Sequence, residues 1–438
     1  MNKISNRLFS SFLSNQDLAK VKLVSYFPLL VDEDKYSLLP SDHCYYYPLT
    51  VDVKQKKVIK GELNFFNQII FNNYKKDNLL SLDKVNFPDL KQVDKQNAII
   101  VNLIDNCYGH SFLKLLNLYE IYSLYKEVFD IFVICPVALQ HYVPKDKFKL
   151  INVKLGFNDA MICYDFEPII LWVKQQYQSI DFVTLDTYYC HQTPDDLTAF
   201  FGFLPENHIS QKQYITFYYR ADYFRTWAGN KQQKRIINFF NQLQNYFPTT
   251  QLVIAGDLDS TKFPNSIKDI RTKAFGKEVD LMCNSYFANS FIVIGLIGSN
   301  MLQPSMFCDF TVHLTQKNKI TIIAEEMLNH PIESMSGWFK NIYLIGNEDL
   351  SDINSNLLCE QIILLYHTYI AKKYKEVAFT NKLFSSRMSQ SEFYKNHYPF
   401  FDSEKSLQLK SNITDFCFKK SIIKYKINKA LKKLKLNY

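Results

Sequence analysis

Residues 291–302 read FIVIGLIGSNML, and this stretch decides the fold class. Its apolar run does not alternate with polar residues, which is typical of a strand buried on both faces. Gly295 and Gly298 then mark a tight turn, and Ser299 and Asn300 are residue types that begin helices. The segment therefore predicts a strand, a turn and a helix in succession, the repeating unit of an α/β protein.

The same alternation extends along most of the chain. Strands are expected at 97–104, 129–135, 149–155 and 181–185, and then at 214–220, 251–256, 291–295, 309–314, 319–324 and 341–346. Helices are expected within 110–126, 165–178, 230–247 and 279–289, and from about 299. The polar stretch 205–213 separates two series, and the first 90 residues read as strand-like pieces with hairpin breaks. We expect an α/β fold with two Rossmann-like domains facing a cleft, 1–208 and 209–375, followed by a helical extension, 376–438.

Composition excludes several classes of protein. The 11 glycines spell neither the dinucleotide-binding fingerprint nor a Walker A loop. The nine cysteines never show C-x-x-C spacing, so no disulfide framework or cysteine zinc site is indicated, and a reducing cytoplasm is expected. No apolar run approaches the length of a membrane-spanning helix, and the first residues do not resemble a secretion signal.

The loops that follow the strands contain the candidate ligands, because open α/β sheets bind ligands at the carboxyl ends of their strands. Gly298, Ser299 and Asn300 would offer backbone N–H groups and polar side chains to a phosphate, or would only cap a helix. Arg220 and Arg225 follow another strand, and guanidinium groups suit bidentate phosphate contact. The alternative for Arg220 is a surface pair with the nearby Asp222.

The first series offers candidates for proton transfer. Asp105 and His110 follow its first strand and would accept a proton from an acceptor hydroxyl, although both residue types also occur in ordinary turns and helix starts.

Two acidic pairs follow strands of the second series. Glu325 and Glu326 would bind ribose hydroxyls or form a solvated helix start. Asp257 and Asp259 form a D-x-D pattern that some transferases use for a divalent metal, but so short a pattern is frequent by chance. We expect neither a metal nor any other cofactor.

The excess of positive over negative charge lies entirely in the tail of the chain. Residues 419–438 contain eight lysines and no acid, which equals the whole net charge of +8. Apolar residues recur there at helical spacing, which predicts an amphipathic cationic helix for an anionic membrane surface. The membrane-binding candidates are Lys420, Lys424, Lys432, Lys433 and Lys435. A solvated terminal helix and a nucleic-acid ligand are the alternatives, and the absence of arginine argues against nucleic acid.

The segments 214–227 and 293–305, with QLVIAG between them, resemble bacterial GT-B glycosyltransferases of surface polysaccharide and lipopolysaccharide synthesis. The stretch from Gly109 to Phe112 is also similar to the G-H-[FW] stretch of family-61-like transferases. The resemblance implies that the second domain binds a nucleotide sugar, with Arg220, Arg225, Gly298, Ser299 and Asn300 at the diphosphate. Relatives often have histidine where this chain has Ile297, and His313 replaces a commoner acid.

These observations predict a metal-independent glycosyltransferase at the inner face of the cytoplasmic membrane. The expected partners are a nucleotide-sugar donor and a glycan or lipid-linked acceptor. Two alternatives remain open: a non-catalytic glycan- or nucleotide-binding protein on the same scaffold, and a metal-dependent GT-A enzyme that uses Asp257 and Asp259.

Overall fold

A computed structural model of the 438-residue chain describes most of the residues from 85 to 366 and a few short segments before them. The described residues are 21–23, 28–30, 36–41, 44–52, 55, 57–60, 85–88, 93, 95–104, 108–153, 167–184, 194–206, 208–209, 212–221, 225–274, 276–319 and 341–366.

The first large sheet has the strand order β10-β7-β8-β9-β6. Strands β10, β7, β8 and β9 run parallel, and β6 pairs with β9 in the antiparallel direction. The strands are β6 (Val85–Asn86), β7 (Asn97–Asn102), β8 (Phe129–Pro136), β9 (Lys149–Val153) and β10 (Ser179–Thr184). The order reverses between β7 and β10, because the chain moves from β7 to β9 on one side and returns to the other side for β10.

Helices lie on both faces of this sheet. They are α3 (Tyr108–Leu116), α4 (Leu118–Tyr125), α5 (Glu167–Lys174) and α6 (Pro194–Phe201), with a 3₁₀ helix η4 (Val137–Tyr142). Phe112, Leu116 and Ile121 of α3 and α4 pack in one core with β7 and β8. The Phe132 ring of β8 points to the opposite face, where it contacts Trp172 of α5 at 6.2 Å between ring centroids.

The second large sheet is parallel throughout and has the order β13-β12-β11-β14-β15-β16. Numbered along the chain, this is the order 3-2-1-4-5-6 of a Rossmann fold, with its switch point between β11 and β14. The strands are β11 (Tyr214–Tyr219), β12 (Gln251–Gly256), β13 (Ile267–Asp269), β14 (Ser290–Leu296), β15 (Phe310–Gln316) and β16 (Asn341–Gly346).

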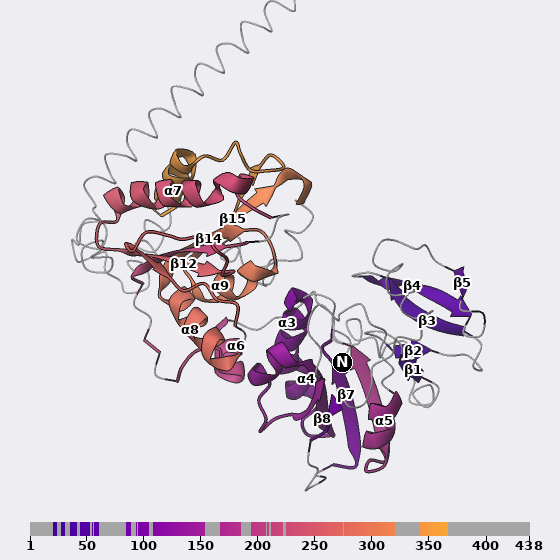
Figure 1. The fold of residues 1–438 in the computed structure, drawn as a ribbon. Coiled ribbons are helices and arrows are strands. Elements are labelled where there is room, and N and C mark those ends of the chain that lie inside the picture. The colour runs from indigo at the N-terminus through magenta and orange to yellow at the C-terminus, as the bar shows by residue number, and fades with distance from the viewer. Residues whose placement is uncertain are drawn as a thin grey trace, which may run out of the picture.

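The second sheet is covered on both faces (Figure 1). Helix α7 (Gln232–Tyr246) and the helical segment 355–366 pack on one face, while α8 (Lys277–Ala288) and α9 (Leu302–Phe307) pack on the other. Short 3₁₀ turns η6 (Gly229–Lys231), η7 (Ser299–Met301) and η8 (Lys317–Lys319) lie in the connections. The expected apolar stripe of α7 is buried: Ile236, Phe239, Phe240 and Leu243 are all 0% exposed.

Small antiparallel strands precede the two sheets. Strand β1 (Val21–Leu23) pairs with β2 (Pro28–Leu30), and β3 (Tyr36–Ser41), β4 (Cys44–Asp52) and β5 (Lys57–Lys60) form a three-stranded sheet. These pairings confirm the hairpin breaks expected in the first 90 residues.

The structure confirms the α/β fold class with two Rossmann-like sheets and corrects three details. The helix expected at 110–126 is two helices that meet at Asn117. The helix expected from 299 is a 3₁₀ turn followed by six α-helical residues. Lys319 ends a 3₁₀ turn rather than beginning a strand, and the rest of 319–324 lies outside the described residues. The domain boundaries at 208 and 375 stay predictions.

Candidate functional site

The candidate site lies at the switch point of the second sheet. The loop after β11 contains Arg220 and Arg225, and the turn after β14 contains Gly298, Ser299 and Asn300. Strands β11 and β14 are hydrogen-bonded neighbours in parallel register, so their carboxyl ends open at the same edge. The two sequence segments predicted to bind one diphosphate are therefore brought together.

Gly298 is surrounded by the three predicted polar side chains. An added Cβ on Gly298 would lie 2.7 Å from Asn300 Oδ1 and 2.8 Å from Arg220 Nη1, and still nearer Arg225 Nη1. The backbone φ of Gly298 is 154°, a conformation that residues with a side chain rarely adopt. Only glycine allows the arginines to approach the backbone of this turn so closely.

Both guanidinium groups contact the turn directly. Arg220 Nη1 donates a hydrogen bond to Asn300 Oδ1 at 3.1 Å, and Arg225 Nη1 donates to the carbonyl oxygen of Ile297 at 3.4 Å. Two permanent positive charges therefore meet at one backbone turn, where a planar donor group can bind phosphate oxygens in pairs.

The helix after this turn is shorter than the sequence indicated. Met301 N–H donates to the Gly298 carbonyl within η7, and α9 has only six residues. A helix this short contributes a small dipole. The electrostatic attraction for an anion at this turn therefore comes mainly from the arginines.

Helix α3, which follows β7 in the chain, reaches the same turn from the first sheet. Gly109, in the first turn of α3, packs so tightly on Ser299 that an added Cβ would overlap the Ser299 Cβ and lie 3.3 Å from Leu302 Cδ1. His110 is the next residue of α3 and is half-buried. The predicted proton acceptor is thus adjacent to the residue that contacts the Gly298 turn.

Polar contacts extend this junction between the two halves. His141 Nε2 lies 2.8 Å from Asp280 Oδ2, and Gln303 Nε2 donates to the Tyr142 hydroxyl at 2.8 Å. Asn284 Nδ2 donates to the Phe203 carbonyl at 3.0 Å.

Burial, reinforced by the negative charge of Asp280, raises the pKa of Tyr108 well above its ordinary value, so this phenol stays neutral at the junction.

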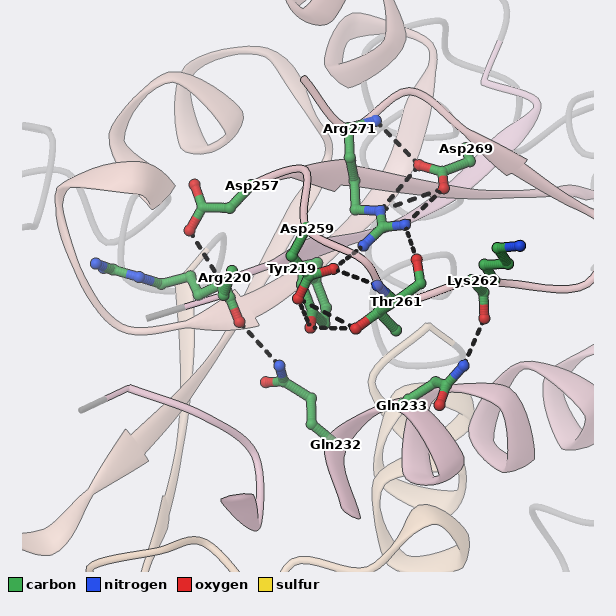
Figure 2. A network of polar contacts seen from close by, with 11 residues as sticks. Tyr219, Arg220, Gln232, Gln233, Asp257, Asp259, Thr261, Lys262, Asp269 and Arg271 are labelled. Atoms are coloured by element: carbon green, nitrogen blue, oxygen red, sulfur yellow. Dashed lines mark hydrogen bonds and ion pairs between the residues drawn. The ribbon is translucent and has the colours of Figure 1, made fainter. Parts of the chain in front are cut away.

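Asp259 of the D-x-D pair lies in a network of hydrogen bonds with Tyr219 and Arg271 rather than in an open acidic site (Figure 2). Asp259 accepts hydrogen bonds from Tyr219 Oη at 2.7 Å and from Arg271 Nη1 at 3.0 Å. Arg271, whose side chain is 1% exposed, also forms a bidentate pair with Asp269. Burial opposes ionisation of Asp259, but hydrogen bonds from Tyr219 and Thr261 and the charge of Arg271 outweigh it and lower its pKa.

Asp257 points elsewhere and holds the arginine loop. Its Oδ2 accepts a hydrogen bond from Ala221 N–H at 3.1 Å. Within the described part of the chain, no group of three or more acidic, histidine or cysteine side chains is arranged to hold a metal ion.

Several predicted residues lie outside the described residues. They are Asp105, Asp222, Glu325, Glu326 and the lysines of the tail, Lys420, Lys424, Lys432, Lys433 and Lys435. In the described ranges, no helix has the length and apolar character needed to cross a bilayer.

The sequence did not indicate that Gln232, at the start of α7, hydrogen-bonds to the loop that carries the two arginines. Its side chain is 4% exposed and bonds to both ends of the loop. A glutamine at a helix start carries no sequence signal of such a role. Only the position of α7 beside the loop reveals it.

Comparison with known proteins gives structural similarity only. No protein-family model and no curated protein sequence matches the chain. ADP-heptose LPS heptosyltransferase II of E. coli is 12% identical, with a TM-score of 0.38 over 62% of this chain and 99% of that one. E. coli heptosyltransferase WaaC with ADP is 7% identical, with a TM-score of 0.36 over 61% of this chain and 98% of that one. TarM is 11% identical, with a TM-score of 0.26 over 86% and 66%.

Proposed function

We propose that this chain transfers a sugar from a nucleotide-diphosphate donor to a glycan or lipid-linked acceptor in bacterial surface-polysaccharide synthesis. The convergence of Arg220 and Arg225 on the Gly298 turn carries the proposal. Sugar transfer leaves negative charge on the departing diphosphate, and donors placed in advance stabilise that charge strongly. In this proposal the arginines replace a divalent metal.

His110 is the proposed proton acceptor. It follows Gly109, which packs on Ser299, so α3 brings an imidazole to the neighbourhood of the donor turn. A neutral histidine has a basicity suited to accepting a hydroxyl proton near neutral pH. Asp105 remains a second candidate for this role, and Glu325 and Glu326 remain candidates for binding ribose.

Replacement of Arg220 tests the donor site. We expect Arg220→Ala to lower the release of nucleoside diphosphate from a panel of sugar nucleotides by roughly 10²- to 10³-fold, the usual effect of losing one oriented donor. Arg220→Lys keeps the charge without the planar fork and should recover only part of the activity.

Lys268→Ala is the matched control, because Lys268 is an exposed cation on β13 and its loss changes the net charge equally. Full turnover by a folded Arg220→Ala protein would remove the diphosphate assignment.

A second candidate function is binding without catalysis. Ile297, 2% exposed, places an apolar side chain where relatives often have histidine. This difference favours a protein that still binds the sugar nucleotide but no longer catalyses transfer. Such a protein would bind the sugar nucleotide and release no diphosphate.

The tail is proposed to hold the enzyme at the inner face of the membrane. Deletion of 419–438 should abolish flotation with vesicles containing phosphatidylglycerol, because each lysine near anionic headgroups contributes roughly 1 kcal/mol. Neutral phosphatidylcholine vesicles are the control and should bind neither form. Equal flotation of full-length and shortened protein would contradict the proposal.

A further inference from the structure

Gln232 closes the loop that carries both arginines. It is the first residue of α7, and its side-chain amide bonds to the two ends of the loop 220–227. Nε2 donates to the Arg220 carbonyl oxygen at 2.9 Å, and Oε1 accepts from Trp227 N–H at 2.9 Å. One amide therefore fixes the distance between the point where the chain leaves β11 and the point where it re-enters the core.

The amide replaces a missing strand partner. At Arg220 the chain has left the ladder between β11 and its neighbours, so its backbone groups need other partners. A buried amide with both its donor and its acceptor in use is rigid, because rotation would break two hydrogen bonds in a site of low polarity. The near-complete burial of Gln232 excludes water as a substitute partner.

The two bonded residues are themselves fixed. The Trp227 ring is 0% exposed, stacks on Phe217, and donates from Nε1 to the Ile353 carbonyl at 2.7 Å. Just after Arg220, Ala221 N–H is held by Asp257. Figure 2 shows Gln232 reaching the Arg220 carbonyl, while the Arg220 side chain extends away from the Asp259 and Arg271 cluster.

We propose that Gln232 is a positioning residue for diphosphate binding, acting through the backbone of the loop on Arg220 and Arg225. This inference rests on the proposed function of those arginines. Gln232 touches neither the Gly298 turn nor a phosphate position in any contact described above. Its effect is to hold the Arg220 backbone where the guanidinium reaches Asn300 and the turn.

The next residue provides a matched control. Gln233 is exposed, and its Nε2 donates to the Lys262 carbonyl on the far side of the Asp259 network (Figure 2). The same substitution at 232 and 233 changes the same chemical group at adjacent positions of one helix. Only the change at 232 alters the arginine loop.

The test compares Gln232→Met, Gln232→Glu, Gln233→Met and Arg220→Ala with the unmodified chain. Methionine keeps the length and removes both hydrogen bonds. Glutamate keeps the acceptor for Trp227 N–H, removes the donor to the Arg220 carbonyl, and provides a second variant if methionine prevents folding. Calorimetry measures binding of ADP, UDP, GDP and CDP, and of the corresponding nucleosides, well below the unfolding midpoint of each protein.

Residues that orient metal ligands typically contribute about 10- to 100-fold in affinity, and we expect roughly 10-fold weaker diphosphate binding in both 232 variants. Affinity for the nucleoside, which lacks phosphates, should stay unchanged. A general loss of structure would weaken both ligands equally, so the ratio of the two affinities isolates positioning in Gln232→Met, which changes no charge. In Gln232→Glu the added carboxylate also repels the diphosphate, so that variant is compared with Gln232→Met and not interpreted alone. Gln233→Met should match the unmodified chain.

The outcomes separate the two proposals. Diphosphate binding that weakens in Arg220→Ala but not in the 232 variants overturns the role of Gln232 alone. Equal weakening of nucleoside and diphosphate in the 232 variants also overturns it. An unmodified chain that binds no nucleoside diphosphate, or an Arg220→Ala protein that binds it normally, overturns the proposed function and the positioning role with it.

Discussion

His313 is a buried ionisable residue in the interior of β15, and its burial makes the stability of the fold sensitive to acid. Its ring is 0% exposed, stacks on Tyr343 at 4.6 Å, and lies 3.3 Å from Asn341 Oδ1 through Nε2. Burial lowers its pKa to about 4, against a slight opposing effect of the Asn341 hydrogen bond. The imidazole is therefore neutral in the folded protein at neutral pH.

This difference predicts a loss of stability in weak acid. Between pH 6.5 and about 4 the unfolded chain takes up a proton at His313 that the folded chain does not, so stability falls as the pH falls. The loss reaches about 3 kcal/mol at pH 4. His313→Gln should remove most of this slope, measured by urea unfolding at pH 7, 5.5 and 4.

The carboxyl groups of Asp259 and Asp269 are acid-sensitive at lower pH. Asp259 and Asp269 have lowered pKa values, so the stability they give is present above their ordinary value near 3.8 and is lost below it. The window of His313 is thus separate from theirs. An unchanged slope between pH 6.5 and 4 in His313→Gln would contradict the assignment.

At the scale of elements, the sequence predicted the strands better than the helices. The strands expected from the apolar runs 251–256 and 291–295 are present as β12 and β14. Parallel strands buried on both faces consist almost entirely of apolar residues, so such runs identify them. β13 was missed, since this short edge strand has Lys268 and Asp269 exposed and shows no apolar run. The break at Asn117 was missed because both α3 and α4 are apolar around it.

The candidate site was predictable only in part. Gly298 and the two arginines follow strands, and the rule that parallel strands end at one edge is enough to bring them together from the sequence. Gln232 was not predictable, because its role depends on how α7 packs beside the loop. The role of Asp259 in the D-x-D pair was also not predictable from the sequence. Its partner Arg271 lies 12 residues further along the chain, and no sequence pattern links the two residues that the fold brings into contact.

At the scale of the molecule, the junction of the two halves combines apolar and polar contacts. Leu302 and Met306 of α9 pack into the core of the first sheet, and Gly109 packs on Ser299. The His141 and Asp280 side chains are 12% and 17% exposed, so their contact is shielded from solvent more than a surface ion pair. The proposed donor contacts and the proposed proton acceptor come from opposite sides of this junction.

This division predicts that the junction affects transfer more than donor binding. His141→Ala removes the contact with Asp280, which should loosen α3 and η4 against α8 and α9 while Arg220, Arg225 and Gly298 keep their mutual contacts. We expect transfer to fall about 10-fold, the equivalent of one lost hydrogen bond of about 1.4 kcal/mol. Donor affinity should stay within about twofold, because every proposed donor contact lies in the second half.

Lys147→Ala is the control for this prediction, since Lys147 pairs with Asp146 at 2.7 Å on the surface of the first half and does not cross the junction. Turnover and equilibrium binding are measured on the same preparations of all three proteins. If donor affinity fell as far as turnover in His141→Ala, the donor site would depend on both halves. The second sheet would then not be sufficient to form it, and the separation of donor binding from proton transfer would be wrong.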